Sequence, residues 1–338
     1  HPCKYMPLHA AVRVLCVGPN PALQKVLSFP SNVELGGVNR AASCDTYVGG
    51  KGQGAALALH RWAGGSGATT GVAQFLGGGS GDFVDAELKS AGLATLTTRV
   101  GAATRTCTTL LDEANKGAPT ELIEPSGVVS EAELASLLAA LDQAAQNYDA
   151  FALCGTTPPG AGELYERVCS LLLARADGAD PLLLLDGFKG VERVLASRRL
   201  DILKLNLDEL LALTERSDAD AAAAELFATV LTRPGCVLAV TDGPRPALIF
   251  LAGGGSASLR VPEIRCVNAI GAGDVCTSIF LYHAAVAREA GPLDLDAAAS
   301  AFAWGLAAAC ARCLQELPTF EQAAVHAMRE RIVIERRG

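Results

Sequence analysis

The amino-acid sequence predicts an α/β fold, in which a parallel sheet is covered by helices and a small accessory β sheet lies over one edge. Short apolar runs alternate with longer helical segments over most of the chain, which is the βα rhythm of a parallel sheet. The strand runs are continuous rather than alternating, as expected where both faces of a sheet are buried. Two further segments alternate Thr, Val and Leu with polar residues and lack helical periodicity, which predicts the accessory sheet.

The elements of the main domain follow from these runs. The predicted strands are Val12–Val17, Ala150–Leu153, Leu182–Leu185, Ile202–Leu205 and Val237–Val240. The predicted helices are Gln53–Trp62, Glu131–Gln146, Gly162–Arg175, Ala219–Thr232, Gly273–Arg288 and the alanine-rich Ala297–Ala311.

The accessory sheet is expected over residues 23–47 and 95–124, where it could cover a site. Residues 1–22, 48–94 and 125–338 would then form the α/β core. The glycine cluster at 77–81 is expected to be a turn, and the mixed charges of 329–337 indicate a solvated helix end.

Composition limits the class of partner. The chain has 338 residues, and its 28 basic and 36 acidic side chains give a net charge of −8, with half of the residues apolar. Such a chain folds rather than staying disordered, and the lack of Lys/Arg clusters speaks against nucleic acid. No apolar stretch reaches the ~20 residues that a membrane span needs.

Cysteine usage favours a reducing compartment. The eleven cysteines are odd in number and scattered, which does not suit a disulfide framework. Cys310 and Cys313, the one Cys-x-x-Cys pair, are expected to pack in a buried helix rather than to bind a metal. We expect a soluble cytoplasmic or organellar protein, and His1 in place of Met fits a processed or trimmed N-terminus.

The most informative segment is Gly271-Ala272-Gly273-Asp274, at the start of a predicted helix. The unpaired N–H groups at a helix start favour an anion, and glycines let a phosphate approach them closely. Asp274 would then be placed to accept a proton from a hydroxyl that attacks a phosphoryl group. An ordinary glycine-rich turn, with Asp274 as a helix-terminal charge, is the alternative.

A second glycine motif, Gly49-Gly50-Lys51-Gly52, also precedes a helix and adds a cation. It is not a Walker loop, because Lys51 is followed by glycine rather than by Ser or Thr.

Three strand ends carry further polar residues. Asn206 and Glu209 share one helix face and offer oxygens that suit Mg²⁺ bound through water. Thr241, with Gly243 close behind, ends the next strand, at the edge where open α/β sheets bind ligands, and Asp186 ends another. For each of these three strand ends, a plain helix cap or turn is an equally good interpretation.

Taken in this order and spacing, these segments resemble the ribokinase-like PfkB family of carbohydrate kinases, over residues 12–315. Within the family they are most similar to the branch of 1-phosphofructokinase and tagatose-6-phosphate kinase. The segments that match this branch are Pro19-Asn20-Pro21-Ala22-Leu23, Val38-Asn39-Arg40, Thr104-Arg105, Thr120-Glu121 and Gly155-Thr156-Thr157-Pro158-Pro159-Gly160.

The resemblance implies a doubly wound α/β core with a β lid, ATP as donor, Mg²⁺, and transfer to a hydroxyl of a sugar phosphate. Asp274 matches the family's catalytic base, and Gly271, Ala272 and Gly273 match its anion hole. The positions that correspond to ATP and Mg²⁺ contacts are Lys204, Asn206, Glu209, Thr241 and Gly243, with the metal held through water by Asn206 and Glu209. The positions on the sugar-phosphate side are Gln24, Gly49, Gly50, Lys51 and Arg105. Relatives that dimerise through their lids imply a homodimer.

Two positions depart from the family pattern. Gln24 stands where the family has Asp, and Gly54 where it has Asn, and both family residues contact the sugar. Leu205 also replaces a proline in Lys-Pro-Asn. The predicted function is therefore an ATP-dependent kinase of a ketohexose phosphate. The alternatives are a catalytically reduced relative that serves as a structural subunit of a larger assembly, and a kinase of another alcohol such as a nucleoside.

Overall fold

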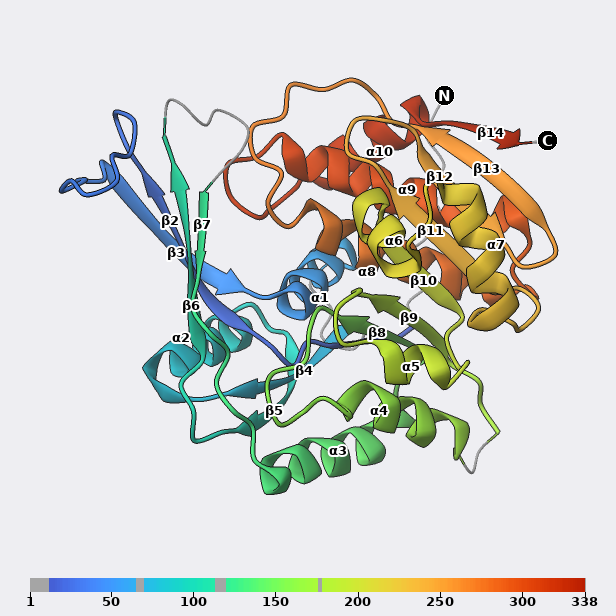
Figure 1. The fold of residues 1–338 in the computed structure, drawn as a ribbon, viewed down its shortest axis with the longest axis horizontal. Coiled ribbons are helices and arrows are strands. Elements are labelled where there is room, and N and C mark those ends of the chain that lie inside the picture. The colour runs from blue at the N-terminus through green and yellow to red at the C-terminus, as the bar shows by residue number, and fades with distance from the viewer. Residues whose placement is uncertain (1–11, 65–69, 113–119, 176–177, 338) are drawn as a thin grey trace.

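The structure is a computed structural model that describes residues 12–64, 70–112, 120–175 and 178–337 (Figure 1). Within these residues a sheet of ten strands carries helices on both faces, and a second sheet of four strands projects from one end. The predicted α/β class is confirmed.

The main sheet has the strand order β14-β13-β12-β11-β10-β9-β8-β1-β4-β5. The bounds of its strands are β1 Val14–Val17, β4 Thr70–Leu76, β5 Ala94–Arg99, β8 Ala150–Cys154, β9 Leu182–Asp186, β10 Ile202–Asn206, β11 Val237–Thr241, β12 Ala247–Leu251, β13 Gly255–Arg260 and β14 Val333–Arg337. In this spatial order, the neighbouring strands from β11 through β10, β9, β8, β1 and β4 to β5 pair in parallel, and those from β14 to β11 pair antiparallel. Because the chain winds outward in both directions from β1, the strand order reverses there, which is where such sheets bind ligands.

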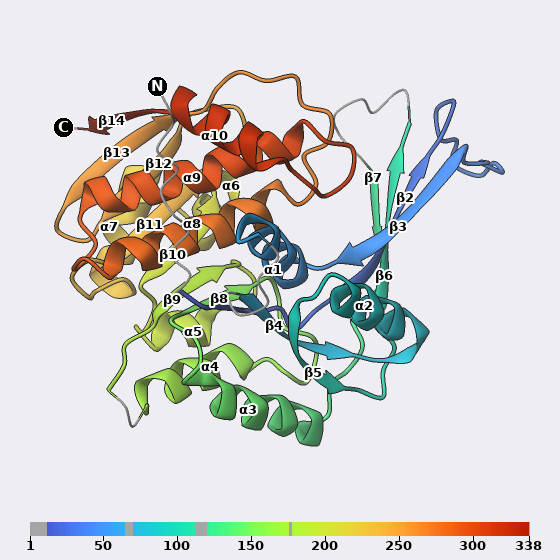
Figure 2. The same cartoon turned by 180° about the vertical axis from the view of Figure 1, so that it is seen from behind.

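Both faces of this sheet are buried, as the side chains of β1 illustrate. Val14 and Cys16 belong to the core on one face, and Leu15 and Val17 to the core on the other. The first face is covered by α1 Lys51–Trp62, α2 Gly78–Ser90, α8 Ala272–Arg288, α9 Leu295–Cys313 and α10 Gln322–Arg331 (Figure 2).

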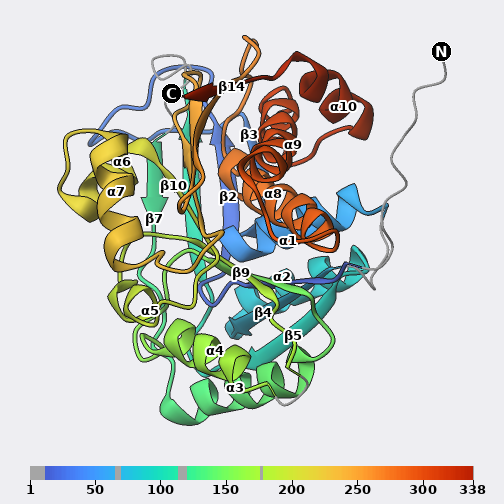
Figure 3. The same cartoon turned by 90° about the vertical axis from the view of Figure 1, so that its right-hand side faces the viewer.

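The second face of the main sheet carries the remaining helices. They are α3 Glu131–Ala145, α4 Leu164–Leu173, α5 Glu192–Ala196, α6 Leu207–Thr214 and α7 Ala219–Thr229. Figure 3 shows α6 and α7 on one side of the sheet and α8 and α9 on the other. Each helix among the described residues is too short or insufficiently apolar to cross a bilayer.

The second sheet, called the lid below, joins two segments that are far apart in the sequence. Its order is β3-β2-β6-β7. The bounds are β2 Ala22–Ser28, β3 Ser43–Gly49, β6 Arg105–Leu111 and β7 Thr120–Ile123. Strands β2 and β6 pair in parallel, so the predicted meeting of the two segments is observed.

One boundary of the predicted accessory sheet is wrong. Strand β5 lies within the segment assigned to it, but it pairs with β4 at the edge of the main sheet. In the sequence its threonines alternate with apolar residues as those of the lid do, and only Thr98 of the strand is buried, because an edge strand is covered less completely than a central one. Alternation therefore could not distinguish this strand from those of the lid.

Two local predictions are also wrong. The cluster at 77–81 is not only a turn, because α2 begins at Gly78, and Val84 and Leu88 pack one turn apart into the core. The C-terminal residues do not end as a helix, since α10 stops at Arg331 and Val333–Arg337 pairs with β13.

Candidate active site

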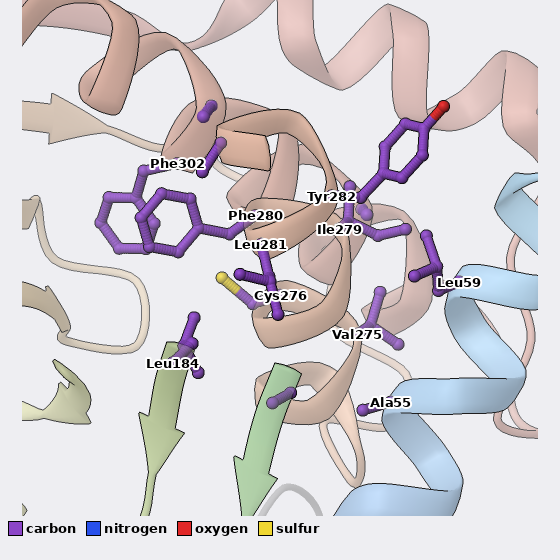
Figure 4. Close-up of a cluster of buried hydrophobic side chains, with 14 of the residues drawn as sticks. Ala55, Leu59, Leu184, Val275, Cys276, Ile279, Phe280, Leu281, Tyr282 and Phe302 are labelled. Carbon is purple, nitrogen blue, oxygen red and sulfur yellow. The ribbon is translucent and has the colours of Figure 1, made fainter. Parts of the chain in front are cut away.

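Helix α8, which carries Asp274, begins at the carboxyl edge of the parallel strands. Gly271 caps it with φ 79°, a left-handed conformation that glycine adopts without steric cost. Figure 4 draws residues that pack α8 against α1, β9 and α9, among them Val275, Cys276, Ile279, Phe280, Ala55, Leu59, Leu184 and Phe302. This packing holds the first turn of α8, with Gly273 and Asp274, at the edge of the sheet.

Asp274 lies against the backbone of α1. A Cβ atom added at Gly54 would lie 3.0 Å from Oδ2 of Asp274 and 3.4 Å from its Cβ. The helix starts that follow the two glycine motifs therefore meet in space.

Asp186, the last residue of β9, is the buried anion beneath the site, with 3% of its surface exposed. Its carboxylate accepts hydrogen bonds from Nζ of Lys51 (3.2 Å) and Nζ of Lys204 (3.1 Å), and from the hydroxyl of Thr277. Burial acts to raise the pKa of Asp186, but the charges of Lys204 and Lys51 outweigh it and hold this pKa at about 2. Asp186 therefore remains ionised.

Lys51, the first residue of α1, is a permanent cation of the site. Burial acts to lower its pKa, but Asp186, Asp274 and Glu209 together raise that pKa above its usual value. Its side chain is 41% exposed, and Nζ lies 4.0 Å from Oε1 of Glu209. Lys51 can thus hold Asp186 and still face a ligand.

The environment of Asp274 acts on its pKa in the opposite direction from that of Asp186. Burial raises its pKa to about 7, and the charge of Asp186 adds to the effect, while Lys51 and Lys204 oppose it. A carboxyl group with a pKa near neutrality can accept and release a proton at ordinary pH, which is what a general base requires.

The first of two cavities beside these residues measures about 260 Å³ and lies at the ends of β1, β8 and β9. Its walls include three cationic side chains, those of Lys51, Arg105 and Lys189. Nε of Arg105 is buried and has no hydrogen-bond partner among the described residues, while Nη2 donates to the carbonyl of Asn20 (3.3 Å). This cationic cavity fits an anionic ligand such as a phosphate ester.

The second cavity measures about 770 Å³ and lies between the end of β11, the loop 261–271 and the helices α8 and α9. Its walls include Thr241 and Gly243, which are predicted ATP contacts, and Ala272 and Gly273 of the predicted anion hole. The remaining walls are largely apolar, with residues such as Pro244, Pro246, Val261, Ile264 and Leu306. An apolar pocket that ends at a helix N-terminus suits a purine base with a phosphate chain.

Asn206 and Glu209 form a capping box at the start of α6. Oδ1 of Asn206 accepts from the Glu209 amide (2.8 Å), and Oε2 of Glu209 accepts from the Asn206 amide (3.0 Å). Oε1 of Glu209 is left facing Lys51 and the cationic cavity. One such carboxylate oxygen fits Mg²⁺ whose other ligands are water and phosphate oxygens, since Mg²⁺ commonly binds proteins in that way. No cluster of three or more ligating side chains occurs among the residues described.

The glycines of the Gly-Gly-Lys-Gly motif allow close backbone contacts. Gly50 has φ 107°, and a Cβ atom added at Gly52 would lie 2.4 Å from Cα of Gly18 at the end of β1. Gln53, fully buried, donates from Nε2 to the carbonyl of Gly18 (2.8 Å). A side chain at Gly52 would therefore push α1 away from β1.

Seven of the predicted site residues line neither cavity: Gln24, Gly49, Gly50, Lys204, Asn206, Gly271 and Asp274. Lys204 is buried beneath the two cavities in its ion pair with Asp186. Nε2 of Gln24 donates across the lid to Oγ1 of Thr109 (2.9 Å), and Gly49 packs against the Gln24 side chain. Lys204 thus supports the site from below, and Gln24 and Gly49 support it from the lid.

The polar walls of the cationic cavity include Asn20, Thr156 and Lys189, which carried no assigned role in the sequence analysis. Nδ2 of Asn20 donates to Oγ1 of Thr156 (3.1 Å), which ties the loop after β1 to the loop after β8. Both residues fall inside segments that carried the family resemblance, so their position was a usable signal. Lys189 lies in an irregular loop after β9 with no motif around it.

Similarity to solved structures agrees with this architecture. Phosphofructokinase-2 of Escherichia coli, in its tetrameric inhibited form, is 20% identical, with 95% of this chain and 99% of that chain covered and a TM-score of 0.77. A possible 1-phosphofructokinase of Thermotoga maritima is 21% identical, with 96% and 100% covered and a TM-score of 0.76. The same Escherichia coli enzyme with fructose-6-phosphate is 19% identical, with 95% and 99% covered and a TM-score of 0.74. The fold is thus a ribokinase-like α/β core with a β lid.

The family follows from the sequence profile of pfkB family carbohydrate kinases, which matches residues 22–318. The chain belongs to this family of carbohydrate kinases.

Proposed function

We propose that the protein transfers the γ-phosphate of ATP to a hydroxyl of a sugar phosphate, with a ketohexose phosphate as the acceptor class. The observation that carries the proposal is the position of Asp274. Asp274 comes directly after Gly273, which lines the apolar cavity. It also lies against Gly54, and the residue before Gly54, Gln53, lines the cationic cavity. A base between a nucleotide site and an anion site suits phosphoryl transfer to a phosphorylated alcohol.

The residues divide the work by charge. Lys51 and Arg105 would hold the phosphate already on the acceptor, which leaves a distant hydroxyl directed toward Asp274. Asp274 would take the proton of that hydroxyl as it attacks. The backbone N–H groups of residues 271–274 would stabilise the charge that develops on the transferred phosphoryl group.

Glu209 would hold Mg²⁺, with its Oε1 atom contacting the ion through a water molecule. The ion, when bound with the nucleotide, supplies neutralisation of the phosphate oxygens. Lys51, 4.0 Å from the same oxygen, would share that task.

The test is a panel of acceptors with ATP and Mg²⁺: fructose 1-phosphate, fructose 6-phosphate, tagatose 6-phosphate, fructose and adenosine. We expect turnover with at least one ketohexose phosphate, weak turnover with fructose, and none with adenosine. Asp274→Asn is the matched control, and it should lose ~10²–10⁴ of the rate while it still binds ATP.

ATP binding without transfer to any member of the panel would contradict the proposal. It would favour the alternative of a structural subunit, which the departures at Gln24 and Gly54 motivate. Turnover with adenosine would point instead to a nucleoside kinase.

A further inference from the structure

Two cysteine side chains meet at the wall of the apolar cavity. Cys266 lies in the loop between β13 and α8, and Cys313 is the last residue of α9. The amides of Val267 and Asn268 both donate to the carbonyl oxygen of Cys313, at 2.7 Å and 3.3 Å. The thiol of Cys266 lies close enough to raise the pKa of Cys313, and both residues line the cavity.

These two thiols differ in access to solvent. Cys266 is exposed, whereas Cys313 is partly buried. Burial raises the pKa of Cys313 to about 12, the neighbouring thiols Cys266 and Cys310 add to the shift, and Arg312 opposes it. Cys266 is therefore the thiol that an external disulfide meets first, and Cys313 is the thiol that resolves the mixed disulfide.

The other described cysteines do not combine a neighbouring thiol with exposure to solvent. Cys16 and Cys154 are also neighbours, on the paired strands β1 and β8, but both lie in the core of the main sheet. Cys44 is exposed on β3 of the lid. Among the ten described cysteines, Cys266 and Cys313 are the one pair of neighbouring thiols of which one is exposed to solvent.

We propose that Cys266 and Cys313 form a reversible disulfide that closes one wall of the apolar cavity and weakens nucleotide binding there. The effect on nucleotide rests on the proposed function, whereas formation of the disulfide does not.

The chemistry needs a disulfide oxidant, for which oxidised glutathione is the simplest representative. The Cys266 thiolate attacks one sulfur of the oxidant, so that a mixed disulfide forms and one glutathione thiolate leaves. The Cys313 thiolate then attacks Sγ of Cys266 and displaces the second glutathione. Two protein thiols are oxidised, one glutathione disulfide is reduced to two thiols, and the two protein protons end on the glutathione.

Formation of the disulfide should change nucleotide binding, because the two sulfur atoms must move toward each other. A disulfide bond is about 2.05 Å long, shorter than the contact of two separate thiols. Helix α9 is buried and packs along α8, so the displacement falls on the loop 261–271. The same loop contributes Val261, Ile264 and Ala269 to the cavity wall and leads into Gly271 at the start of α8.

The experiment equilibrates the full chain in glutathione buffers of increasing oxidised fraction, followed by thiol alkylation and peptide mapping. In the wild type we expect a bridged peptide that joins Cys266 to Cys313. Cys313→Ser should stop at a glutathione adduct on Cys266, and Cys266→Ser should leave Cys313 free. Cys44→Ser, the matched control, should bridge as the wild type does. A wild-type protein in which Cys266 carries glutathione while Cys313 is still alkylated would overturn the proposal.

ATP affinity is then measured on the reduced and the bridged protein. We expect the bridged form to bind ATP about fivefold or more weakly, and saturating ATP to oppose bridging by the same factor, since coupling is reciprocal. Neither serine variant should change its ATP affinity with oxidation, whatever that affinity is when reduced. Equal affinity of the two wild-type forms would refute the coupling. If the bridge forms but neither form binds ATP, the proposed function fails, and the coupling fails with it.

Discussion

Gly54 lies so near the carboxylate of Asp274 that a Cβ atom added at position 54 would be 3.0 Å from Oδ2. This contact places the start of α1 against the start of α8 and limits how the carboxylate can turn. A side chain at position 54 would share the space that an acceptor hydroxyl needs.

The first prediction concerns this contact. Gly54→Ala should lower kcat by roughly tenfold with little change in ATP affinity, because the added methyl group displaces the carboxylate of Asp274. Gly79→Ala is the matched control, since a Cβ atom there meets no other atom within 4 Å. Steady-state kinetics with the best acceptor measure both variants. Equal losses in the two would show that the contact has no role.

The second prediction is the pH dependence of turnover. Asp274 must be ionised to act as a base, and its pKa of about 7 means that kcat/KM rises with pH through neutrality and levels above it. Below the pKa the rise should be about tenfold per pH unit. Asp274→Asn should show no such rise, and a wild-type profile already flat from pH 5 upward would contradict the assignment.

A third prediction links the same group to stability. The pKa of Asp274 in the folded protein is higher than in the unfolded chain, so ionisation disfavours folding, and stability falls as pH rises from about 4 to about 7. Asp274→Asn should therefore be more stable than the wild type at pH 8, by about 1–2 kcal/mol, or roughly 2–5 °C in Tm. The difference should vanish near pH 4. Calorimetry at the two pH values decides the matter, and a less stable variant at pH 8 would be evidence against the raised pKa.

The fourth prediction concerns Asp186. Asp186→Asn leaves Lys204 buried without its counter-ion, so we expect a loss of about 3–5 kcal/mol. The depressed pKa of Asp186 stabilises the fold above pH 4, and this contribution is lost as pH falls toward 2. Asp149→Asn, which alters an exposed pair with Arg13, is the control and should cost less than about 1 kcal/mol.

The milder change Thr277→Val tests the same network without removing a charge. It deletes one hydrogen bond to Asp186 and should cost about 1–2 kcal/mol in chemical denaturation. If Asp186→Asn proves no more destabilising than Thr277→Val, the ion pairs contribute little.

The fifth prediction concerns the lid. Leu122 and Ile123 on its edge strand β7 are 55% and 58% exposed, and exposed edges invite pairing with another chain. We expect a homodimer that pairs through the lid, and Ile123→Lys should shift light scattering toward the monomer. Leu173→Lys, at a 65% exposed leucine on α4, should leave the dimer unchanged. A wild-type monomer at all concentrations would refute this prediction.

Much of the core could be predicted because burial on both faces produces uninterrupted apolar runs. The strands at 150–153, 182–185, 202–205 and 237–240 were found from their sequence alone. Strand β4 was missed although it is wholly buried, because glycine, threonine and glutamine interrupt its apolar run. Strand β5 was assigned to the wrong sheet because polar threonines between apolar residues occur in the sequence of this edge strand as they do in the lid strands.

The residues suited to the chemistry can be named from the sequence, because a glycine-rich helix start followed by Asp274 indicates an anion site without any distant partner. How those residues act on one another depends on the tertiary structure. Asp186, Lys51 and Lys204 come from three separate elements, and their charges shift the pKa of Asp274 through distances that no sequence spacing records. The contact of Gly54 with Asp274, and that of Cys266 with Cys313, likewise exist only because α1, α8 and α9 pack side by side.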